Sequence, residues 1–178
     1  MNKAFFIDKD GTLTNYNVYS NPALAKEVLE DEIIFDQIVD GLKHIQKKGY
    51  KLIIISNQPW ISRGVVNYDD MEKLFQNLIK VLGNHGVKID DYFYCPHQTL
   101  DNCECKKPKP KMILDAAKKY KINLKESYFV GDMDLDILAG QNAGTKTILV
   151  LTGCGNEFKN IVNPTYILKN LNHIKEII

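Results

Sequence analysis

The sequence predicts an α/β fold in which a parallel sheet is covered by helices on both faces. Short apolar runs alternate along the chain with segments of helical spacing, which is the pattern of βαβ units. These runs are continuous rather than alternating in polarity, as in strands that are buried on both sides. The 178 residues, 44% of them hydrophobic, suit one compact domain over residues 1–178.

Five strands are expected, and each ends in a polar or glycine-containing segment. Because ligands bind beyond the carboxyl ends of strands in open parallel sheets, these segments form the candidate site. The expected strands are Ala4–Ile7, Leu52–Ile55, Tyr92–Tyr94, Tyr128–Val130 and Thr147–Leu151.

Helical spacing fills the intervals between these strands. Apolar residues three and four positions apart predict helices, and glycine or proline marks several of their ends. The segment Thr14–Phe35 fits a loop, a cap or a short helix, so its assignment is left open. The expected helices cover Ile38–Ile45, Met71–Leu82, Pro110–Tyr120 and a short segment around Ile137 that ends near Gly144.

Charge and hydropathy exclude several classes of function. Lys and Arg total 23 against 22 Asp and Glu, so the chain lacks the basic excess of proteins that bind nucleic acid or membrane surfaces. The longest apolar runs fall far short of the ~18 residues that a membrane span needs, and the apolar segment after Lys3 is too short for a secretory signal. We therefore expect a soluble, cytoplasmic monomer that acts on a small molecule.

Three cysteines and a histidine crowd into one short segment. Thiolate and imidazole ligands without a carboxylate suit a closed tetrahedral Zn²⁺ site, and a reducing compartment disfavours disulfides. Buried thiols without a metal are the alternative. We expect a structural zinc loop over about residues 95–109, which fixes the two lysines that directly follow its last cysteine. The expected zinc ligands are Cys95, His97, Cys103 and Cys105.

Carboxylates follow two of the expected strands. Asp8 and Asp10 lie two residues apart after the first strand, and Asp132 follows Gly131 after another, with Asp136 close behind. Carboxylates this close repel one another unless a cation lies between them, and Mg²⁺ prefers oxygen ligands. Alone, Asp-x-Asp-Gly is usually turn chemistry, but two such acidic segments make that alternative weak.

These residues suit phosphoryl transfer through a covalent intermediate. Asp8 is placed to attack phosphorus, and Asp10 is placed to protonate the leaving alcohol and then to deprotonate the attacking water. Ser56, at the end of the second strand, offers a hydroxyl to a phosphoryl oxygen. Lys107 or Lys109 would supply positive charge, with a solvated basic loop as the alternative for both.

Four segments resemble the four motifs of haloacid-dehalogenase-superfamily (HAD) phosphatases, and they occur in the same order. The fuller resemblance is to the D-glycero-D-manno-heptose 1,7-bisphosphate 7-phosphatases, which are close relatives of the histidinol-phosphatase domains. Ser56–Gly64, Lys107–Pro110 and Ala139–Gly144 carry this second resemblance. The four motif segments are Asp8–Leu13, Ser56–Gln58, Lys107–Pro108 and Gly131–Asp136.

The resemblance implies a Rossmann-like three-layer sandwich with a minimal cap, with Asp8 as the nucleophile and Asp10 as the acid/base. It implies Mg²⁺ held by Asp8, the Asp10 backbone carbonyl and Asp132, with Asp136 in a supporting role. It also implies that Lys107, rather than Lys109, binds the phosphate. The related phosphatases carry a zinc loop at this place as well.

The resemblance further implies which residues face the substrate, although this chain departs from the family pattern. Lys106 stands where the family usually has arginine, and Pro59-Trp60 replaces a pair of small residues. Trp60 either stacks on the substrate, closes the site or packs in the core. Arg63 has a phosphate as its obvious partner. The substrate-binding candidates are Tyr19, Asn57, Gln58, Arg63 and Lys106.

We therefore expect a Mg²⁺-dependent phosphomonoesterase that works through an aspartyl-phosphate and removes the 7-phosphate of D-glycero-D-manno-heptose 1,7-bisphosphate. Histidinol phosphate or another small sugar phosphate is the alternative substrate. A receiver domain, which keeps a phosphoryl group on an aspartate as a signal, is disfavoured because it has no need of a zinc loop.

Overall fold

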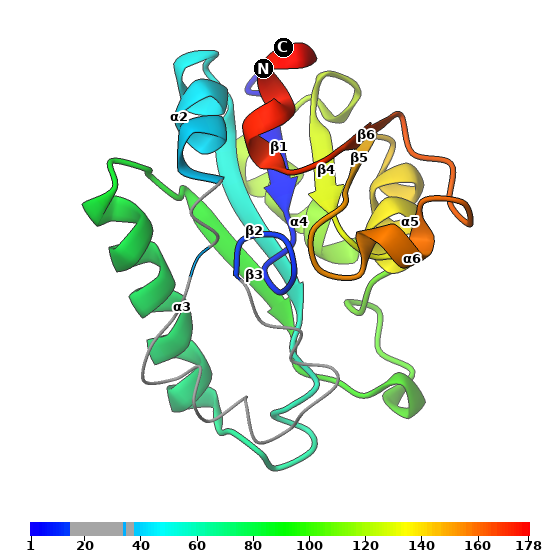
Figure 1. Cartoon of the computed structure of the whole chain (residues 1–178). Coiled ribbons are helices and arrows are strands. Elements are labelled where there is room, and N and C mark those ends of the chain that lie inside the picture. Colours follow the sequence, from blue (N-terminus) through cyan, green and yellow to red (C-terminus); the bar gives the residue numbers. More distant parts are fainter. Residues whose placement is uncertain (15–33, 35–37) are drawn as a thin grey trace.

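The computed structural model describes residues 1–14, 34 and 38–178. Its six strands form one sheet in the order β3-β2-β1-β4-β5-β6 (Figure 1). Every pair of neighbouring strands is parallel, which confirms the predicted sheet. The strands are β1 (Ala4–Ile7), β2 (Lys51–Asn57), β3 (Asp91–Cys95), β4 (Tyr128–Gly131), β5 (Lys146–Val150) and β6 (Tyr166–Leu168).

The helices predicted from apolar spacing are present, and two of their ends show clear caps. Asn67 precedes α3, and its side chain accepts a hydrogen bond from the Asp70 backbone N–H at 2.8 Å. Gly144, with a φ of +84°, ends α5 in the left-handed conformation that glycine adopts without strain. The helices are α2 (Val39–Lys47), α3 (Tyr68–Asn84), α4 (Lys111–Tyr120), α5 (Asp134–Ala143) and α6 (Gly155–Phe158), with 3₁₀ segments η2 (Thr99–Asp101), η3 (Leu124–Glu126) and η4 (Leu171–Glu176).

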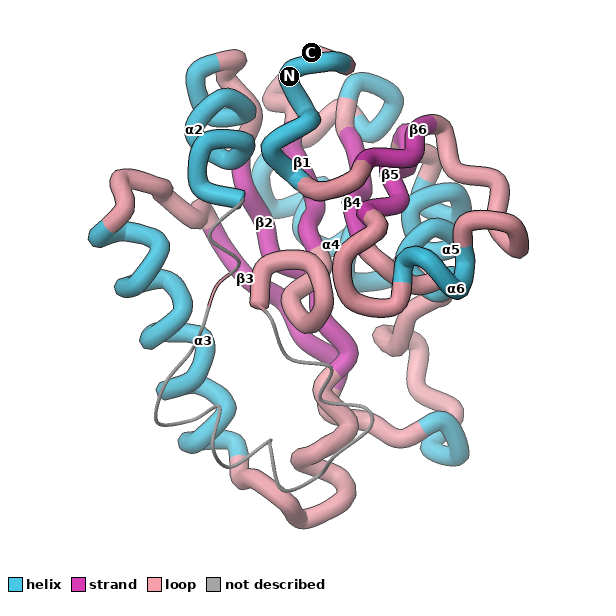
Figure 2. Tube along the Cα trace, in the orientation of Figure 1, coloured by secondary structure: helices cyan, strands magenta, loops and turns pink. Residues whose placement is uncertain are grey.

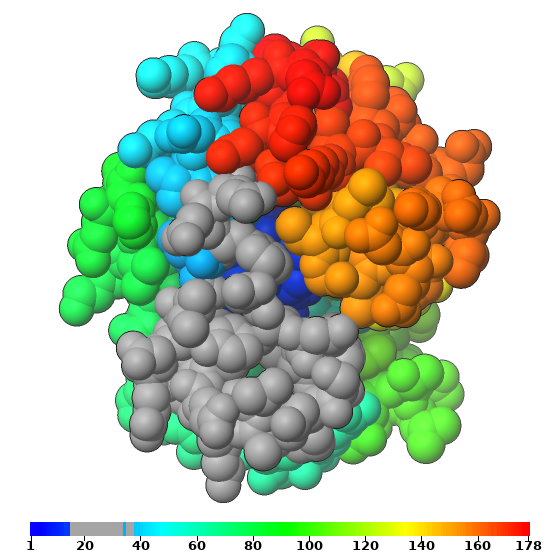
Figure 3. Space-filling model, in the orientation of Figure 1, coloured from blue at the N-terminus to red at the C-terminus, as the bar shows by residue number. Residues whose placement is uncertain are grey.

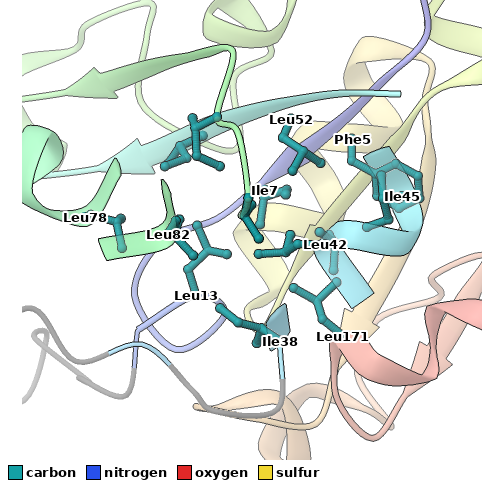
Figure 4. Packing of buried hydrophobic residues seen from close by; sticks show 14 of the residues in the cluster. Phe5, Ile7, Leu13, Ile38, Leu42, Ile45, Leu52, Leu78, Leu82 and Leu171 are labelled. Carbon is teal, nitrogen blue, oxygen red and sulfur yellow. The ribbon is translucent and has the colours of Figure 1, made fainter. Parts of the chain in front are cut away.

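Successive strand residues face opposite layers of helices, as a period of two requires. Phe5 and Ile7 of β1 pack in a cluster with side chains of α2, α3 and η4, and Figure 4 shows part of this cluster. Ala4 and Phe6 pack in a second cluster with side chains of α4 and α5. The sheet is therefore buried on both faces, and the predicted three-layer arrangement is confirmed.

One strand and one α-helix were not predicted from the sequence. The edge strand β6 is only three residues long and leaves Tyr166 and Ile167 exposed, so it has no buried apolar run. The short helix α6 has too few residues for a helical period. Most of Thr14–Phe35, including Tyr19, lies outside the described residues. Within the described part of the chain, no helix has the length and apolar character needed to cross a membrane.

The loops at the carboxyl edge of the sheet gather in one place. Figure 2 shows the loops after β1 and β5 beside each other, although β4 separates these strands in the sheet. The Thr152 hydroxyl donates to the Gly11 carbonyl at 2.7 Å and ties the two loops together. In Figure 3 the segment around η2 projects at the lower right, where Leu100 is almost fully exposed.

Candidate active site

Asp8 directly extends the first strand. Its backbone N–H donates to the Val130 carbonyl at 2.9 Å, so β1 stays bonded to β4 up to this residue. The chain then turns at Gly11, whose φ of +86° would strain a residue with a side chain. A Cβ at Gly11 would also lie 2.3 Å from Asp132 Oδ2. Glycine is therefore required for the two acidic loops to approach this closely.

Lys107 connects the two acidic loops through its ammonium group. Its Nζ lies 2.5 Å from Asp8 Oδ1, 2.6 Å from Asp136 Oδ1 and 3.0 Å from the Ile55 carbonyl, and the side chain is buried. Burial alone would lower the pKa of Lys107, but the charges of Asp136 and Asp8 outweigh it and raise that pKa. The lysine stays charged. Asp136 also accepts the Met133 N–H at 3.0 Å through Oδ2, so the start of α5 fixes its position.

Three carboxylates converge at this point. Oxygen atoms of Asp8, Asp132 and Asp136 all lie within 4.8 Å of one another. Asp132 Oδ2 accepts the Cys154 backbone N–H at 2.8 Å, whereas the buried Oδ1 has no hydrogen-bond partner among the described residues. Burial, and next the charge of Asp136, raise the pKa of Asp132 to about 7. The same two causes raise the pKa of Asp8, although Lys107 opposes them.

A divalent cation would relieve both problems of this cluster. It would offset the mutual repulsion of the carboxylates, and it would give Asp132 Oδ1 the partner that it lacks. The donors are all oxygens, which Mg²⁺ prefers. The residues present therefore fit Mg²⁺. The participation of the Asp10 backbone carbonyl stays a prediction.

Both oxygens of the Asp10 carboxylate are held by buried side chains. Lys9 Nζ lies 2.8 Å from Oδ1, and Gln58 Nε2 lies 2.7 Å from Oδ2. Gln58 Nε2 also donates to Ser56 Oγ at 2.8 Å. Lys9 was not among the predicted site residues. The feature that indicates Lys9 is its place in the sequence, between two carboxylates at the end of a buried strand.

Asn57 holds the backbone of Lys107. Its Oδ1 accepts the Lys107 N–H at 3.0 Å, and its Nδ2 donates to the Lys107 carbonyl at 3.3 Å. Asn142 of α5 donates to the next carbonyl, that of Pro108, at 3.0 Å. Asn57 and Gln58 were expected to bind substrate. The structure places their amides against Lys107 and Asp10, and a direct contact with substrate stays a prediction.

The Cys/His cluster forms in the loop after β3. Its sulfur and Nδ1 atoms lie within 4.8 Å of one another, with distances from 3.1 Å between the Cys105 and Cys95 sulfurs to 3.5 Å between those of Cys95 and Cys103. Zn–S and Zn–N bonds of about 2.3 and 2.0 Å give ligand separations of roughly 3.5–3.8 Å in a tetrahedron, so the set fits zinc. Lys106 donates to the His97 carbonyl at 3.1 Å, which ties this lysine to the zinc loop.

The remaining predicted residues differ in their surroundings. Trp60 is buried in the core, which supports the packing role, and the Arg63 guanidinium carbon lies 5.0 Å above its ring on an exposed surface. Lys109 is half-exposed and pairs with Glu104, whereas Lys107 lies inside the site. A cavity of about 270 Å³ adjoins Lys107 and is lined by zinc-loop residues that include Lys106.

None of the predicted site residues lies in the loop after β5, although this loop follows one of the expected strands. A Cβ at Gly153 would lie 2.1 Å from Asp132 Oδ2 and 2.7 Å from the Cα of Gly11. With the Cys154 N–H, this loop encloses the Asp132 carboxylate. The pattern that indicates this loop is a glycine three residues after a strand, at the edge where Asp8 and Asp132 also lie.

Comparisons with known proteins agree with this geometry. A family model described as HAD-hydrolase-like matches residues 104–174. The D-glycero-beta-D-manno-heptose-1,7-bisphosphate 7-phosphatase of Helicobacter pylori is 40% identical over 151 residues, which are 84% of each chain. That of Pasteurella multocida is 34% identical over 185 residues, covering 100% of this chain and 97% of the relative. The D-glycero-alpha-D-manno-heptose-1,7-bisphosphate 7-phosphatase of Campylobacter jejuni is 34% identical over 84% of this chain and 82% of the relative.

Solved structures agree on the fold. A D,D-heptose 1,7-bisphosphate phosphatase from B. bronchiseptica, complexed with magnesium and phosphate, has a TM-score of 0.85 at 24% identity and covers 98% of this chain and 96% of that chain. The same enzyme from Burkholderia thailandensis has a TM-score of 0.71 at 19% identity over 96% and 94% of the two chains. From the identity to its relatives, the chain belongs to the D-glycero-D-manno-heptose-1,7-bisphosphate 7-phosphatase family of HAD-type phosphatases.

Proposed function

We propose that this protein is a Mg²⁺-dependent phosphomonoesterase that removes the 7-phosphate of D-glycero-D-manno-heptose 1,7-bisphosphate. The observation that carries the proposal is the position of the Lys107 ammonium, which lies 2.5 Å from Asp8 and 2.6 Å from Asp136. In the same cluster, Asp132 Oδ1 is buried without a hydrogen-bond partner among the described residues. A fixed carboxylate, a buried cation and oxygen ligands for a metal are what phosphoryl transfer through an aspartate requires. The named activities of the relatives supply the substrate.

The chemistry proceeds in two displacements. A carboxylate oxygen of Asp8 attacks phosphorus and forms an aspartyl-phosphate, while the bond from phosphorus to the sugar oxygen breaks and Asp10 gives that oxygen a proton. Asp10 then takes a proton from water, whose oxygen attacks phosphorus, releases phosphate and restores Asp8. Ser56 and Lys107 bind the phosphoryl oxygens. Mg²⁺ held by Asp8, Asp132 and the Asp10 carbonyl would offset charge on these oxygens.

The second phosphate of the substrate needs cations of its own. Lys106, on the cavity of about 270 Å³, and the exposed Arg63 are the candidates, together with Tyr19. Zn²⁺ on the Cys/His cluster has a structural role in this proposal, because it fixes the loop that carries Lys106 and Lys107. We also propose a cytoplasmic monomer, in which the cluster thiols stay reduced.

Steady-state kinetics test the proposal. We expect kcat/KM with Mg²⁺ to be highest for one anomer of heptose 1,7-bisphosphate and lower for histidinol phosphate. Both anomers belong in the assay because relatives of both names match. Phosphorus NMR identifies the phosphate released. Asp8→Asn should abolish turnover and the acid-stable phosphoenzyme. Turnover without added magnesium, or by Asp8→Asn, would contradict the mechanism, and a preference for histidinol phosphate would contradict the substrate.

A further inference from the structure

We propose that Gln58 is a positioning residue for the acid/base carboxylate of Asp10 rather than a ligand of the substrate. The inference rests on the proposed function, because it concerns the proton transfer in that mechanism. Gln58 directly follows β2, which lies next to β1 in the sheet. This neighbourhood brings its side chain beside the loop that carries Asp10.

The hydrogen-bonding capacity of the Gln58 amide nitrogen is fully used inside the protein. This nitrogen has two hydrogens to donate and accepts none. It donates one to Asp10 Oδ2 at 2.7 Å and the other to Ser56 Oγ at 2.8 Å. The Gln58 backbone N–H donates to the Cys95 carbonyl at 2.7 Å, and only 2% of the residue is exposed. The nitrogen therefore has no hydrogen left for a substrate oxygen.

The other Asp10 oxygen is held from a different direction. Lys9 Nζ lies 2.8 Å from Oδ1, and this lysine is 1% exposed. Thr14 Oγ1 donates to the same oxygen at 3.4 Å, and with donors on both oxygens the plane of the Asp10 carboxylate is fixed. A general acid is effective only when its oxygen lies within hydrogen-bond reach of the leaving oxygen. Loss of Gln58 frees the carboxylate to rotate, while Asp8 and Lys107 keep their own contacts.

This role has a kinetic signature that depends on the leaving group. A sugar alkoxide is a poor leaving group and needs the proton from Asp10, whereas 4-nitrophenolate leaves without one. Gln58→Leu removes both donors and keeps most of the bulk. Acid/base catalysis contributes about 10²–10⁴-fold, so we expect the ratio of kcat/KM for heptose 1,7-bisphosphate to that for 4-nitrophenyl phosphate to fall at least about tenfold. Gln58→Leu also removes the hydrogen bond to Ser56. A loss of activity caused by a displaced Ser56 would lower kcat/KM for both substrates equally, so it would not change the ratio.

Three comparisons complete the experiment. Gln141→Leu makes the same change on the exposed face of α5, where the amide donates to the Asn163 carbonyl, and should leave the ratio unchanged. Asp10→Asn should lower the ratio more than Gln58→Leu does. Adding Gln58→Leu to Asp10→Asn should lower it no further, because one group acts through the other. Gln58→Met replaces Gln58→Leu if that variant has lost its cooperative unfolding transition.

The outcomes separate this inference from the proposed function. An equal loss on both substrates with Gln58→Leu, accompanied by weaker inhibition by inorganic phosphate, would identify Gln58 as a substrate ligand and overturn the inference alone. If Asp10→Asn itself leaves the ratio unchanged, the acid/base assignment fails and the inference fails with it. A selective loss in Gln58→Leu that vanishes in the Asp10→Asn background supports both.

Discussion

Removing the charge of Asp132 should make the magnesium-free protein more stable at neutral and alkaline pH. Burial, and then the charge of Asp136, raise the pKa of Asp132 from 3.8 to about 7. A carboxyl group whose pKa rises on folding binds protons as the protein folds. Its contribution to stability is therefore complete below about pH 4 and is lost as the pH rises through about 7.

The size of the effect follows from the shift. A rise of about three pKa units, at 1.36 kcal/mol each, corresponds to about 4 kcal/mol of unfolding free energy. Asp132→Asn keeps the shape of the side chain, and its carbonyl oxygen can still accept the Cys154 N–H. At about pH 8 without magnesium we expect the free energy of unfolding of the variant to exceed that of the wild type by up to about 4 kcal/mol. At about pH 4 the two free energies should be equal. Magnesium should stabilise the wild type and reverse the order.

Urea unfolding between about pH 4 and pH 8 measures this difference. Magnesium is removed by dialysis rather than by a chelator, so that a metal on the Cys/His cluster is not stripped. Asp115→Asn is the matched control, because Asp115 lies exposed on α4 in a pair with Lys111 at 2.7 Å. The difference between its free energy of unfolding and that of the wild type should change little with pH. A difference for Asp132→Asn that is equally independent of pH would refute the reasoning.

Three further variants test the rest of the site. Lys107→Met should lower kcat/KM by about 10²–10³-fold, since it removes a buried cation next to the reacting group, whereas Lys109→Met should stay near the wild type. Cys103→Ser should lower zinc content and raise KM with the circular dichroism of the sheet retained; full activity in zinc-free protein would contradict the positioning role. Gly153→Ala should weaken magnesium binding in a calorimetric titration, because its Cβ would overlap the metal-facing carboxylate, whereas Gly83→Ala, with no atom within 4 Å of its Cβ, should leave that binding unchanged.

The fold could be predicted because four of its strands, β1, β2, β4 and β5, are almost fully buried. The run Ala4–Ile7 coincides with β1, and the other predicted strands lie within a residue or two of β2 to β5. The pattern failed at the short edge strand β6, two of whose three residues are exposed. In β6 only Leu168 is buried, so Tyr166–Leu168 lacks the apolar run that identified the other strands.

The site was only partly predictable, since the sequence shows residue types and the fold decides their partners. The acidic residues and the Cys/His cluster follow from spacing, and the structure brings each set together. That Lys9 and Gln58 meet on Asp10 depends on β2 lying beside β1, which is a tertiary contact. The enclosure of Asp132 by Gly153 likewise depends on two loops meeting across β4.

The junction between the loops after β1 and β5 has a consequence for how the protein is made. Thr152 and Gly153 contact Gly11 and complete the surroundings of Asp132, although Thr152 follows Gly11 by 141 residues in the chain. A chain that lacks this segment holds Asp8 but not the enclosure of the Asp132 carboxylate beside it. A message truncated before β5 would therefore encode a polypeptide with an incomplete site, which we expect to be inactive.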